Sequence, residues 1–306
     1  MKFKVMVLSS TLAASAAYAA PVFAQSQFTQ TALFNVPEAN QGVAVDKHFF
    51  YAIDNATIAK YTKSGKFVAK WQGAAGGPII HLDSGVVING KLYAAHSNYR
   101  RFPLTSSIEV WETQTLTHIG SHSIGIALGS LTWLDEHDGA WYGAFANYDK
   151  VGQTPGGTNT TLAYASVPQL GKASSTIVRF NSDWQVVEGW VFPVELLDSF
   201  GDMSNSGGSF GPDGRLYITG HDNTEVYKIR FPEAGSLLEV EERIPVTVRG
   251  QGVAWDPSLA GVFYGVIRAT DAEVAQGVTN KVAVFQTNVS KRDPKDWLKD
   301  AYRFRP

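Results

Sequence analysis

Short segments in which apolar and polar residues alternate run along most of the chain. The clearest repeat is QGVAVD at 41–46 and QGVAWD at 251–256, and each copy is followed by a second apolar run, at 49–54 and 262–267. Alternation with a period of two is typical of β-strands that bury one face. Repetition of a whole segment indicates an architecture built from copies of one unit.

Three further units of the same kind lie between these copies, at 84–96, 130–145 and 208–220. In each, an apolar run leads through a turn with Gly, Asn or Asp into a second run that contains aromatic residues. Asn-Gly and Asp-Gly pairs between two such runs are strong hairpin signals. A third alternating segment follows every second run, and a fourth follows four of them, so we expect each unit to be a four-stranded sheet.

The last unit has no fourth strand of its own, whereas the segment FTQTALFNVP at 28–37 stands before the first unit without a partner. The pattern therefore predicts an all-β fold, a β-propeller with five four-stranded blades that the N-terminal strand closes, at about 45 residues a blade. A six-bladed propeller is the second choice. A β-sandwich would leave the repeated unit and the displaced strand unexplained.

One segment breaks the spacing of the repeats. Residues 151–175 are rich in Gly and Thr and show no periodicity, which predicts a long loop inserted into the third blade. Near the C-terminus, residues 290–302 have a capping Asp followed by Pro and predict a short helix. We therefore expect residues 25–306 to form a single propeller domain.

The N-terminus has the form of a secretory signal peptide. Lys2 and Lys4 precede a run of apolar and small residues, and a cleavage site of the small-x-small kind ends at Ala24. Such a segment is removed on export, so we expect a leader at 1–24 and a mature chain that begins at Gln25. The absence of cysteine fits a bacterial periplasm, and the predicted location is periplasmic or secreted.

Composition excludes several classes of partner and chemistry. The formal net charge is −2 and no basic run is present, which argues against a nucleic-acid surface. No segment is long and apolar enough for a membrane span. Without cysteine there is no thiolate metal site or Cys nucleophile. We expect a monomer that binds a small molecule and uses no organic cofactor.

A propeller brings certain loops together around one opening. The first strand of each blade lines the central channel, so the starts of first strands and the ends of second strands meet on the same face. Aligned on an aromatic residue of the second strand, Asn98, Asn147 and Asp222 fall at the same offset in three consecutive blades. Oxygen ligands suit Ca²⁺, and nearby histidines suit Zn²⁺. The three residues are therefore predicted ligands of a possible divalent cation.

Other polar residues at the same strand ends are candidates for catalysis and binding. His96 and His221 are predicted to move a proton, with Asp83 as a third catalytic candidate. The predicted substrate-binding residues are Gln41, His81, Tyr99, Tyr148, Gln251 and Arg268. Asn, Asp and His are also common at strand ends because they form turns and tolerate left-handed backbone, so turn formation is the alternative explanation.

The segment DGRLYITGHDNTEVYKIRF at 213–231 resembles blades of the gluconolactonase, senescence-marker and strictosidine-synthase-like propellers. The resemblance implies a divalent cation at the channel mouth, held by Glu, Asn and Asp, that activates water or polarises a lactone. Asn147 and Asp222 match the Asn and the Asp. Gln41 stands where the Glu is expected, and that group has six blades. Five-bladed glutaminyl cyclotransferases of the plant type are an equally distant comparison.

Three functions fit these observations. The first is an enzyme that acts on a small organic molecule at the channel mouth, by cation-assisted hydrolysis of a lactone or ester or by isomerisation. The second is a non-catalytic propeller that binds a ligand or another protein. The third is a sugar-active enzyme, which needs two facing carboxylates; Asp54, Asp83 and Asp222 are its candidates.

Overall fold

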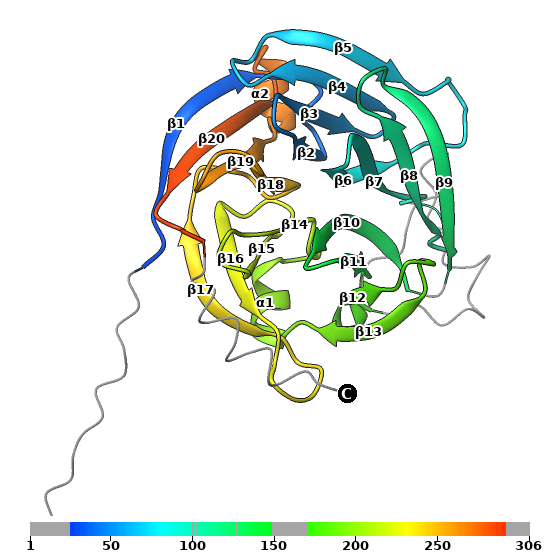
Figure 1. Cartoon of the computed structure of the whole chain (residues 1–306), viewed down its shortest axis with the longest axis vertical. Coiled ribbons are helices and arrows are strands. Elements are labelled where there is room, and N and C mark those ends of the chain that lie inside the picture. Colours follow the sequence, from blue (N-terminus) through cyan, green and yellow to red (C-terminus); the bar gives the residue numbers. More distant parts are fainter. Residues whose placement is uncertain (1–24, 100, 102, 127, 149–170, 292–306) are drawn as a thin grey trace, which may run out of the picture.

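The computed structural model describes residues 25–291, except 100, 102, 127 and 149–170. Its strands form five antiparallel sheets of four strands, arranged as blades around a central axis (Figure 1). The predicted five-bladed β-propeller is therefore confirmed. The expected leader and the C-terminal helix lie outside the described residues, and so does most of the predicted loop at 151–175.

In the first four blades the strands follow one another in chain order from the axis to the rim, as the hairpin signals predicted. The first three blades contain β2 (Gly42–Val45), β3 (Phe49–Asp54), β4 (Thr57–Thr62) and β5 (Phe67–Gln72); β6 (Leu82–Ile88), β7 (Lys91–Ser97), β8 (Ser106–Glu112) and β9 (Thr117–Gly125); and β10 (Ser130–His137), β11 (Ala140–Ala146), β12 (Thr176–Phe180) and β13 (Val186–Val191). The last two contain β14 (Gly207–Phe210), β15 (Leu216–Thr219), β16 (Glu225–Arg230) and β17 (Glu239–Pro245); and β18 (Val253–Trp255), β19 (Val262–Ile267) and β20 (Lys281–Thr287).

The fifth blade is completed from the other end of the chain. Strand β1 (Phe28–Asn35) pairs antiparallel with β20, from Phe28 opposite Thr287 to Asn35 opposite Lys281. Figure 1 shows the two strands side by side, β1 in blue and β20 in red-orange. The N-terminal strand therefore closes the ring, as its unpaired position in the sequence predicted.

Five buried clusters lie between neighbouring blades, including one between the first and the last. Because both faces of a blade are covered, the inner strands are buried on both sides: every residue of β4 except the last is buried. The outer strand β13 is instead almost entirely exposed. Even Lys60 of β4 is buried, and its ammonium group donates to the carbonyl of Thr113 at 2.9 Å and lies 4.1 Å from the centre of the Phe49 ring.

The aspartates of the repeated QGVAVD and QGVAWD segments stabilise turns. Asp46 Oδ1 accepts hydrogen bonds from the amides of His48 and Phe49. Asp256 Oδ1 accepts from the amides of Ser258 and Leu259. Both carboxylates therefore hold the turn between the first and second strands, which explains the repetition without any chemistry.

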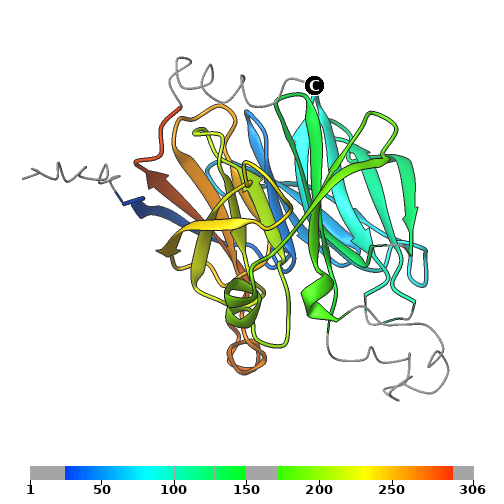
Figure 2. The same cartoon turned by 90° about the horizontal axis from the view of Figure 1, so that it is seen from below.

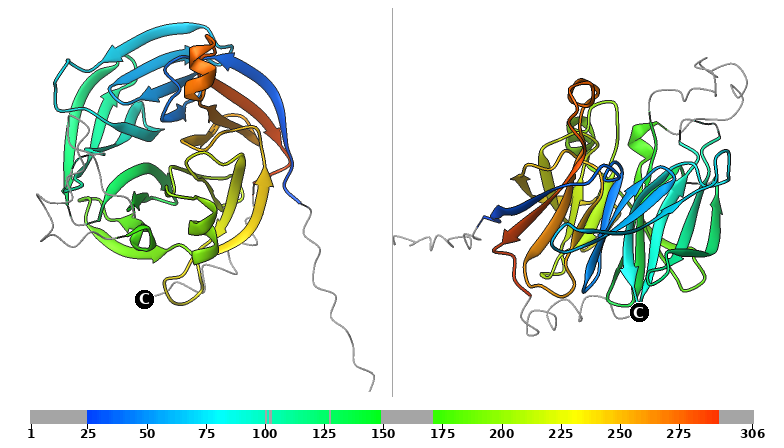
Figure 3. Two further views of the ribbon diagram at one scale, coloured as in Figure 1. Left: turned by 180° about the vertical axis from the view of Figure 1, so that it is seen from behind. Right: turned by 90° about the horizontal axis from the view of Figure 1, so that it is seen from above.

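Two short helices stand on the same face of the disc, α1 (Val194–Ser199) and α2 (Asp271–Ala275) (Figures 2 and 3). We call this the upper face; the first strand of each blade begins there. Helix α2 begins with a capping box in which Thr270 and Glu273 hydrogen-bond each other's backbone amides. No helix in the described ranges is long and apolar enough to cross a membrane.

Because β1 closes the ring, we expect Phe28→Ala to destabilise the fold strongly. Phe28 makes edge contacts with Phe263 at 5.1 Å and with Trp255 at 5.9 Å between ring centres. Its truncation is expected to lower the free energy of unfolding by about 2 kcal/mol, since a half-buried aromatic contact is lost. The matched control is Leu33→Ala on the same strand, which is 45% exposed and is expected to cost less than about 0.5 kcal/mol. If urea denaturation showed the same loss of unfolding free energy for both variants, the proposed role of Phe28 in closing the ring would be contradicted.

Candidate functional site

A cavity of about 1070 Å³ opens at the channel end on the upper face. We call it the mouth cavity. It is lined by residues from all five blades, which come from the starts of first strands and the ends of second strands, as the propeller geometry predicted. Its predicted lining residues are Gln41, His81, Asp83, Tyr99, Tyr148, His221, Asp222, Gln251 and Arg268. The sequence therefore located this opening correctly.

Asp83 lies in a β-bulge of the channel strand β6. The pairing of β6 with β7 jumps from Leu82 opposite His96 to Gly85 opposite Ala94, which leaves Asp83 and Ser84 unpaired in the ladder. Bulges redirect side chains and are frequent beside active sites. Both residues are buried, and within the described structure neither Asp83 Oδ2 nor Ser84 Oγ has a hydrogen-bond partner. An unsatisfied buried polar atom costs about 1–3 kcal/mol, so the bulge keeps polar groups available at a price in stability.

Burial raises the pKa of the Asp83 carboxyl well above its usual range, because a charged carboxylate is poorly solvated there. The same effect raises the pKa of the Tyr148 phenol, and the neighbouring Asp83 and Tyr99 add to it. The two pKa shifts place Asp83 and the tyrosines in one poorly hydrated cluster. Groups with strongly shifted pKa values in a cavity are candidates for function.

The hydrogen bonds of His81 define which of its ring nitrogens carries the proton. Asn55 donates from its side-chain nitrogen to the Asp54 carboxylate at 2.9 Å, and a carboxylate only accepts. The Asn55 oxygen therefore faces His81 Nδ1, at 2.5 Å, and Nδ1 must be the donor. In the neutral ring Nε2 is then the unprotonated nitrogen, and it lies 3.6 Å from Asp83 Oδ1.

Asn55 was not among the residues predicted from the sequence. It follows Asp54 at the end of β3 and lies five residues after Phe50, the same offset that selected Asn98, Asn147 and Asp222. The signal was therefore present, but three consecutive aromatic residues, at 49–51, made the reference position ambiguous.

Aromatic rings form one wall of the mouth cavity. The ring centre of Tyr99 lies 5.1 Å from that of His81 and 5.0 Å from that of Tyr148. The Tyr99 hydroxyl also contacts the sulfur of Met203, at 4.0 Å. The base nitrogen of His81 thus lies beside flat apolar surface that a ligand can pack against.

His221, Asp222 and Arg268 form a separate cluster at the rim. His221 Nδ1 lies 2.6 Å from Asp222 Oδ2, and Arg268 donates to Asp222 Oδ1 at 2.8 Å. Hydrogen bonding to His221 and the charge of Arg268 lower the pKa of Asp222 to about 2. Gln251 donates to the carbonyl of His221 at 3.3 Å, with its own backbone at a φ of +62°. The residues of the rim cluster thus form hydrogen bonds with one another.

Asn98 and Asn147 differ from the predicted ligand arrangement. Asn98 donates to the carbonyl of Pro103 and accepts from the amide of Thr105, both at 2.8 Å. The side chain of Asn147 donates to two loop carbonyls, those of Leu128 and Ser174.

Neither asparagine lines the mouth cavity, so the two do not join Asp222 in a ligand set. Turn formation, the alternative explanation, accounts for both. Across the described residues, no three His, Asp or Glu side chains are grouped as metal ligands. Binding of a divalent cation stays a prediction, and these two asparagines do not fit it.

His96 is also placed differently from its predicted catalytic role. Its Nε2 accepts from the amide of Ile80 at 3.2 Å, and its Nδ1 lies 2.8 Å from the hydroxyl of Ser107. Burial lowers its pKa, which favours the neutral ring. Both nitrogens are therefore occupied in joining strands of the second blade. His81, predicted only to bind substrate, has the geometry of a base instead.

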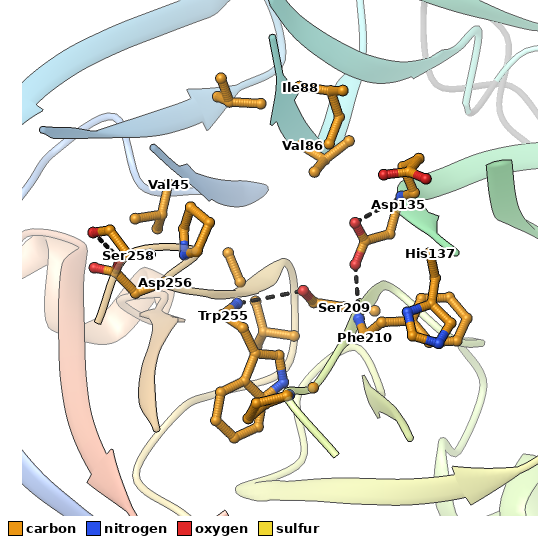
Figure 4. Close-up of a pocket in the computed structure, with 18 of the residues that line it drawn as sticks. Val45, Val86, Ile88, Asp135, His137, Ser209, Phe210, Trp255, Asp256 and Ser258 are labelled. Carbon is orange, nitrogen blue, oxygen red and sulfur yellow. Dashed lines mark hydrogen bonds between the residues drawn. The ribbon is translucent and has the colours of Figure 1, made fainter. Parts of the chain in front are cut away.

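The opposite end of the channel holds a smaller cavity of about 460 Å³, at the ends of the first strands (Figure 4). Its polar groups connect blades. Asp135 accepts from the amide of Phe210 in the next blade at 2.7 Å, and burial raises its pKa to about 6. Ser209 accepts from the amide of Trp255, again across a blade boundary. We therefore assign this cavity a structural role.

Fold and site together define a β-propeller with a polar, partly buried cavity at one end of its channel. No protein-family model matches the sequence, and no curated protein matches it either. The structure is similar to that of glutaminyl cyclase from Myxococcus xanthus, with a TM-score of 0.52, 11% identity and coverage of 88% of this chain and 97% of that chain.

It is also similar to the PQQ-bound form of aldose sugar dehydrogenase from Streptomyces coelicolor. That comparison has a TM-score of 0.52 and 11% identity, and it covers 86% of this chain and 99% of that chain. Likenesses at such identities show the propeller fold and nothing about the reaction.

The raised pKa of Asp83 predicts how stability depends on pH. Below about pH 4 the carboxyl is protonated in the folded and the unfolded chain; above it only the unfolded chain ionises, so stability falls as pH rises toward the folded pKa. Asp83→Asn removes this cost. Its melting temperature is expected to exceed that of the wild type by a margin that grows from about pH 4 up to the raised pKa of Asp83 and is constant above it.

The matched control for this measurement is Asp222→Asn. The lowered pKa of Asp222 means that ionisation stabilises the fold above its unfolded pKa, and that this contribution is lost as pH falls toward 2. This variant is therefore expected to melt lower than the wild type near pH 7. An Asp83→Asn curve parallel to the wild-type curve at every pH would exclude the buried, unpartnered carboxyl.

The contact with Asn55 predicts the tautomer of His81. In ¹⁵N NMR spectra we expect neutral His81 to carry its proton on Nδ1. Asn55→Asp retains an acceptor and is expected to retain this tautomer, whereas Asn55→Leu removes the acceptor and is expected to shift the proton toward Nε2. Asp222→Asn should alter the signals of His221 only. A wild-type spectrum with the proton on Nε2 would overturn the assignment.

Proposed function

We propose that the protein is an exported enzyme that acts on a small organic molecule in the mouth cavity, with His81 as the proton acceptor. The observation that carries the proposal is the contact of His81 Nδ1 with the Asn55 oxygen, which makes Nε2 the basic nitrogen of the neutral ring, 3.6 Å from the buried Asp83. A base oriented by a second group is the recurrent arrangement of general-base catalysis. Fold alone would support no reaction.

Hydrolysis of an ester or lactone fits this arrangement. Water gives a proton to His81 Nε2 as its oxygen adds to the carbonyl carbon; the leaving oxygen takes that proton when the carbon–oxygen bond breaks. Where its carboxyl is ionised, Asp83 stabilises the imidazolium formed in between, because Oδ1 lies 3.6 Å from Nε2. An isomerisation would use the same base to move a proton on carbon. The resemblance of residues 213–231 to gluconolactonase-type blades supports the lactone and ester class.

No step is assigned to a divalent cation, because the side chains of Asn98 and Asn147 do not line the mouth cavity and form hydrogen bonds in their own loops. His221, the other predicted catalytic histidine, is held between Asp222 and Arg268 at the rim. Its position suits contact with the outer end of a substrate. Gln41, Gln251 and Arg268 are the remaining proposed contacts around the opening.

The test is a screen of the mature chain, residues 25–306, against lactones and aryl esters with a pH indicator. For any substrate that turns over, His81→Gln is expected to lower kcat by at least about a hundredfold, the usual contribution of a general base. His96→Gln is the matched control and is expected to keep the wild-type kcat in the fraction that folds.

A wild-type rate in His81→Gln would refute the assignment of the base. Ligand binding in the cavity without turnover of any compound would favour a non-catalytic binding propeller instead.

A further inference from the structure

We propose that the mouth cavity binds the ammonium group of a small primary amine at Asp83. The inference deepens the proposed function, on which it rests only where it names amine-bearing molecules as the substrate class. Binding itself stands on the contacts, charges and rings of the cavity.

The first support is the unsatisfied oxygen of Asp83. Its side chain lines the cavity and is only 5% exposed, yet Oδ2 has no donor among the residues that the structure describes. Oδ1 is directed toward His81, at 3.6 Å from Nε2, which leaves Oδ2 for a ligand. Buried polar atoms in native proteins are nearly always paired, and one that is not needs an explanation. A bound ammonium group would supply the missing donor.

The second support is the balance of charge around the cavity. Four carboxylates line it, those of Asp54, Asp83, Asp222 and Asp271. Both lining arginines are already engaged: Arg268 with Asp222, and Arg249 with Glu273.

Within the described residues, Asp54, Asp83 and Asp271 have no Lys or Arg partner. An anionic ligand would be repelled by those carboxylates that are ionised and would oppose the ionisation of Asp83, and a neutral ligand would do neither. A cation is attracted by the ionised carboxylates and favours the ionisation of Asp83, so the charge favours a positively charged ligand.

The third support is the aromatic wall. The Tyr99 and Tyr148 rings lie 5.0 Å apart between their centres, and the charge of Asp83 is close enough to Tyr148 to raise the pKa of its phenol. A cation beside a carboxylate and over tyrosine rings gains from both contacts, and the second gain increases as water is excluded. The arrangement therefore suits an organic cation with apolar substituents.

An ammonium group fits the donors and acceptors better than a metal ion does. Calcium takes six to eight oxygen ligands, and zinc takes about four nitrogen, sulfur or oxygen ligands. The described residues provide no group of three such side chains. An ammonium ion has three N–H donors and needs one strong acceptor with weaker partners around it, which Asp83 and its neighbours provide.

Binding should be linked to proton release. Burial raises the pKa of Asp83, so the free protein holds a proton there up to a higher pH than usual, and a bound ammonium group favours the ionised carboxylate. Affinity is therefore expected to rise with pH until Asp83 ionises unaided, and to fall once the amine itself deprotonates above about pH 10.

The experiment is calorimetric titration of the folded mature chain with hexylammonium chloride. Neutral 1-hexanol and sodium hexanoate serve as probes of the same shape and different charge. Hexylammonium is expected to bind at least about tenfold more tightly than hexanol, with hexanoate weaker still. Titrations in two buffers with different ionisation enthalpies, repeated at several pH values, should show a proton released on binding below the raised pKa of Asp83.

Asp83→Asn is expected to reduce the affinity for hexylammonium at least about tenfold and the affinity for hexanol less than about twofold. The matched control is Asp271→Asn, an exposed carboxylate of the same cavity, with less than about a twofold effect. Melting curves verify that both variants fold. Equal binding of amine and alcohol, or full amine affinity in Asp83→Asn, would overturn the proposal.

Titration with CaCl₂ and ZnCl₂ separates the other cationic ligand. Metal binding that excludes hexylammonium and depends on Asp83 would replace the amine proposal. Amine binding without turnover of any ester or lactone would refute the proposed function and leave the amine site standing. Turnover that depends on His81, with no preference for amines, would support the proposed function and refute the amine site.

Discussion

The structure depends above all on one constraint, the closure of a ring in which every blade must bury both of its faces. Each blade packs on two neighbours, and a cluster of apolar side chains fills each of the five boundaries. At the boundary between the last and the first blade, β1 pairs with β20 and adds Ala32 and Phe34 to the apolar cluster. Strands from the two ends of the chain therefore pair to close the ring, and the channel exists because the ring is closed.

Closure also explains why polar groups gather at the channel mouth. Inside the ring the first strands approach one another closely: a side chain on Gly42 or Gly252 would collide with Ser84. The channel is thus tightly packed at these positions, and the larger of its two described cavities lies where the first strands begin. At that end β6 bulges and places Asp83 in the cavity next to His81. Burial of the Asp83 carboxyl destabilises the fold, and the packing of the closed ring offsets this loss of stability.

The sequence located the mouth but not the roles within it. Strand order puts Gln41, His81, Asp83 and Gln251 at one face, which periodicity and hairpin signals suffice to show. The offset that selected Asn98 and Asn147 was equally regular, yet their side chains serve their own loops. A common offset specifies a common position on the backbone. It does not specify where an amide finds its hydrogen-bond partners, because those belong to loops of different length and shape.

By itself, then, the sequence determined the number of blades, their strand order and the N-terminal strand that completes the last one, because a period of two and a repeated hairpin are local properties of a chain. The tertiary structure alone decided which polar groups are satisfied. Asn98, Asn147 and His96 form hydrogen bonds within their own blades. His81 forms a hydrogen bond with Asn55 of the neighbouring blade, and Asp83 Oδ2 forms none in the described structure. Hydrogen bonding and desolvation depend on atoms brought together from distant residues, and no local pattern records them.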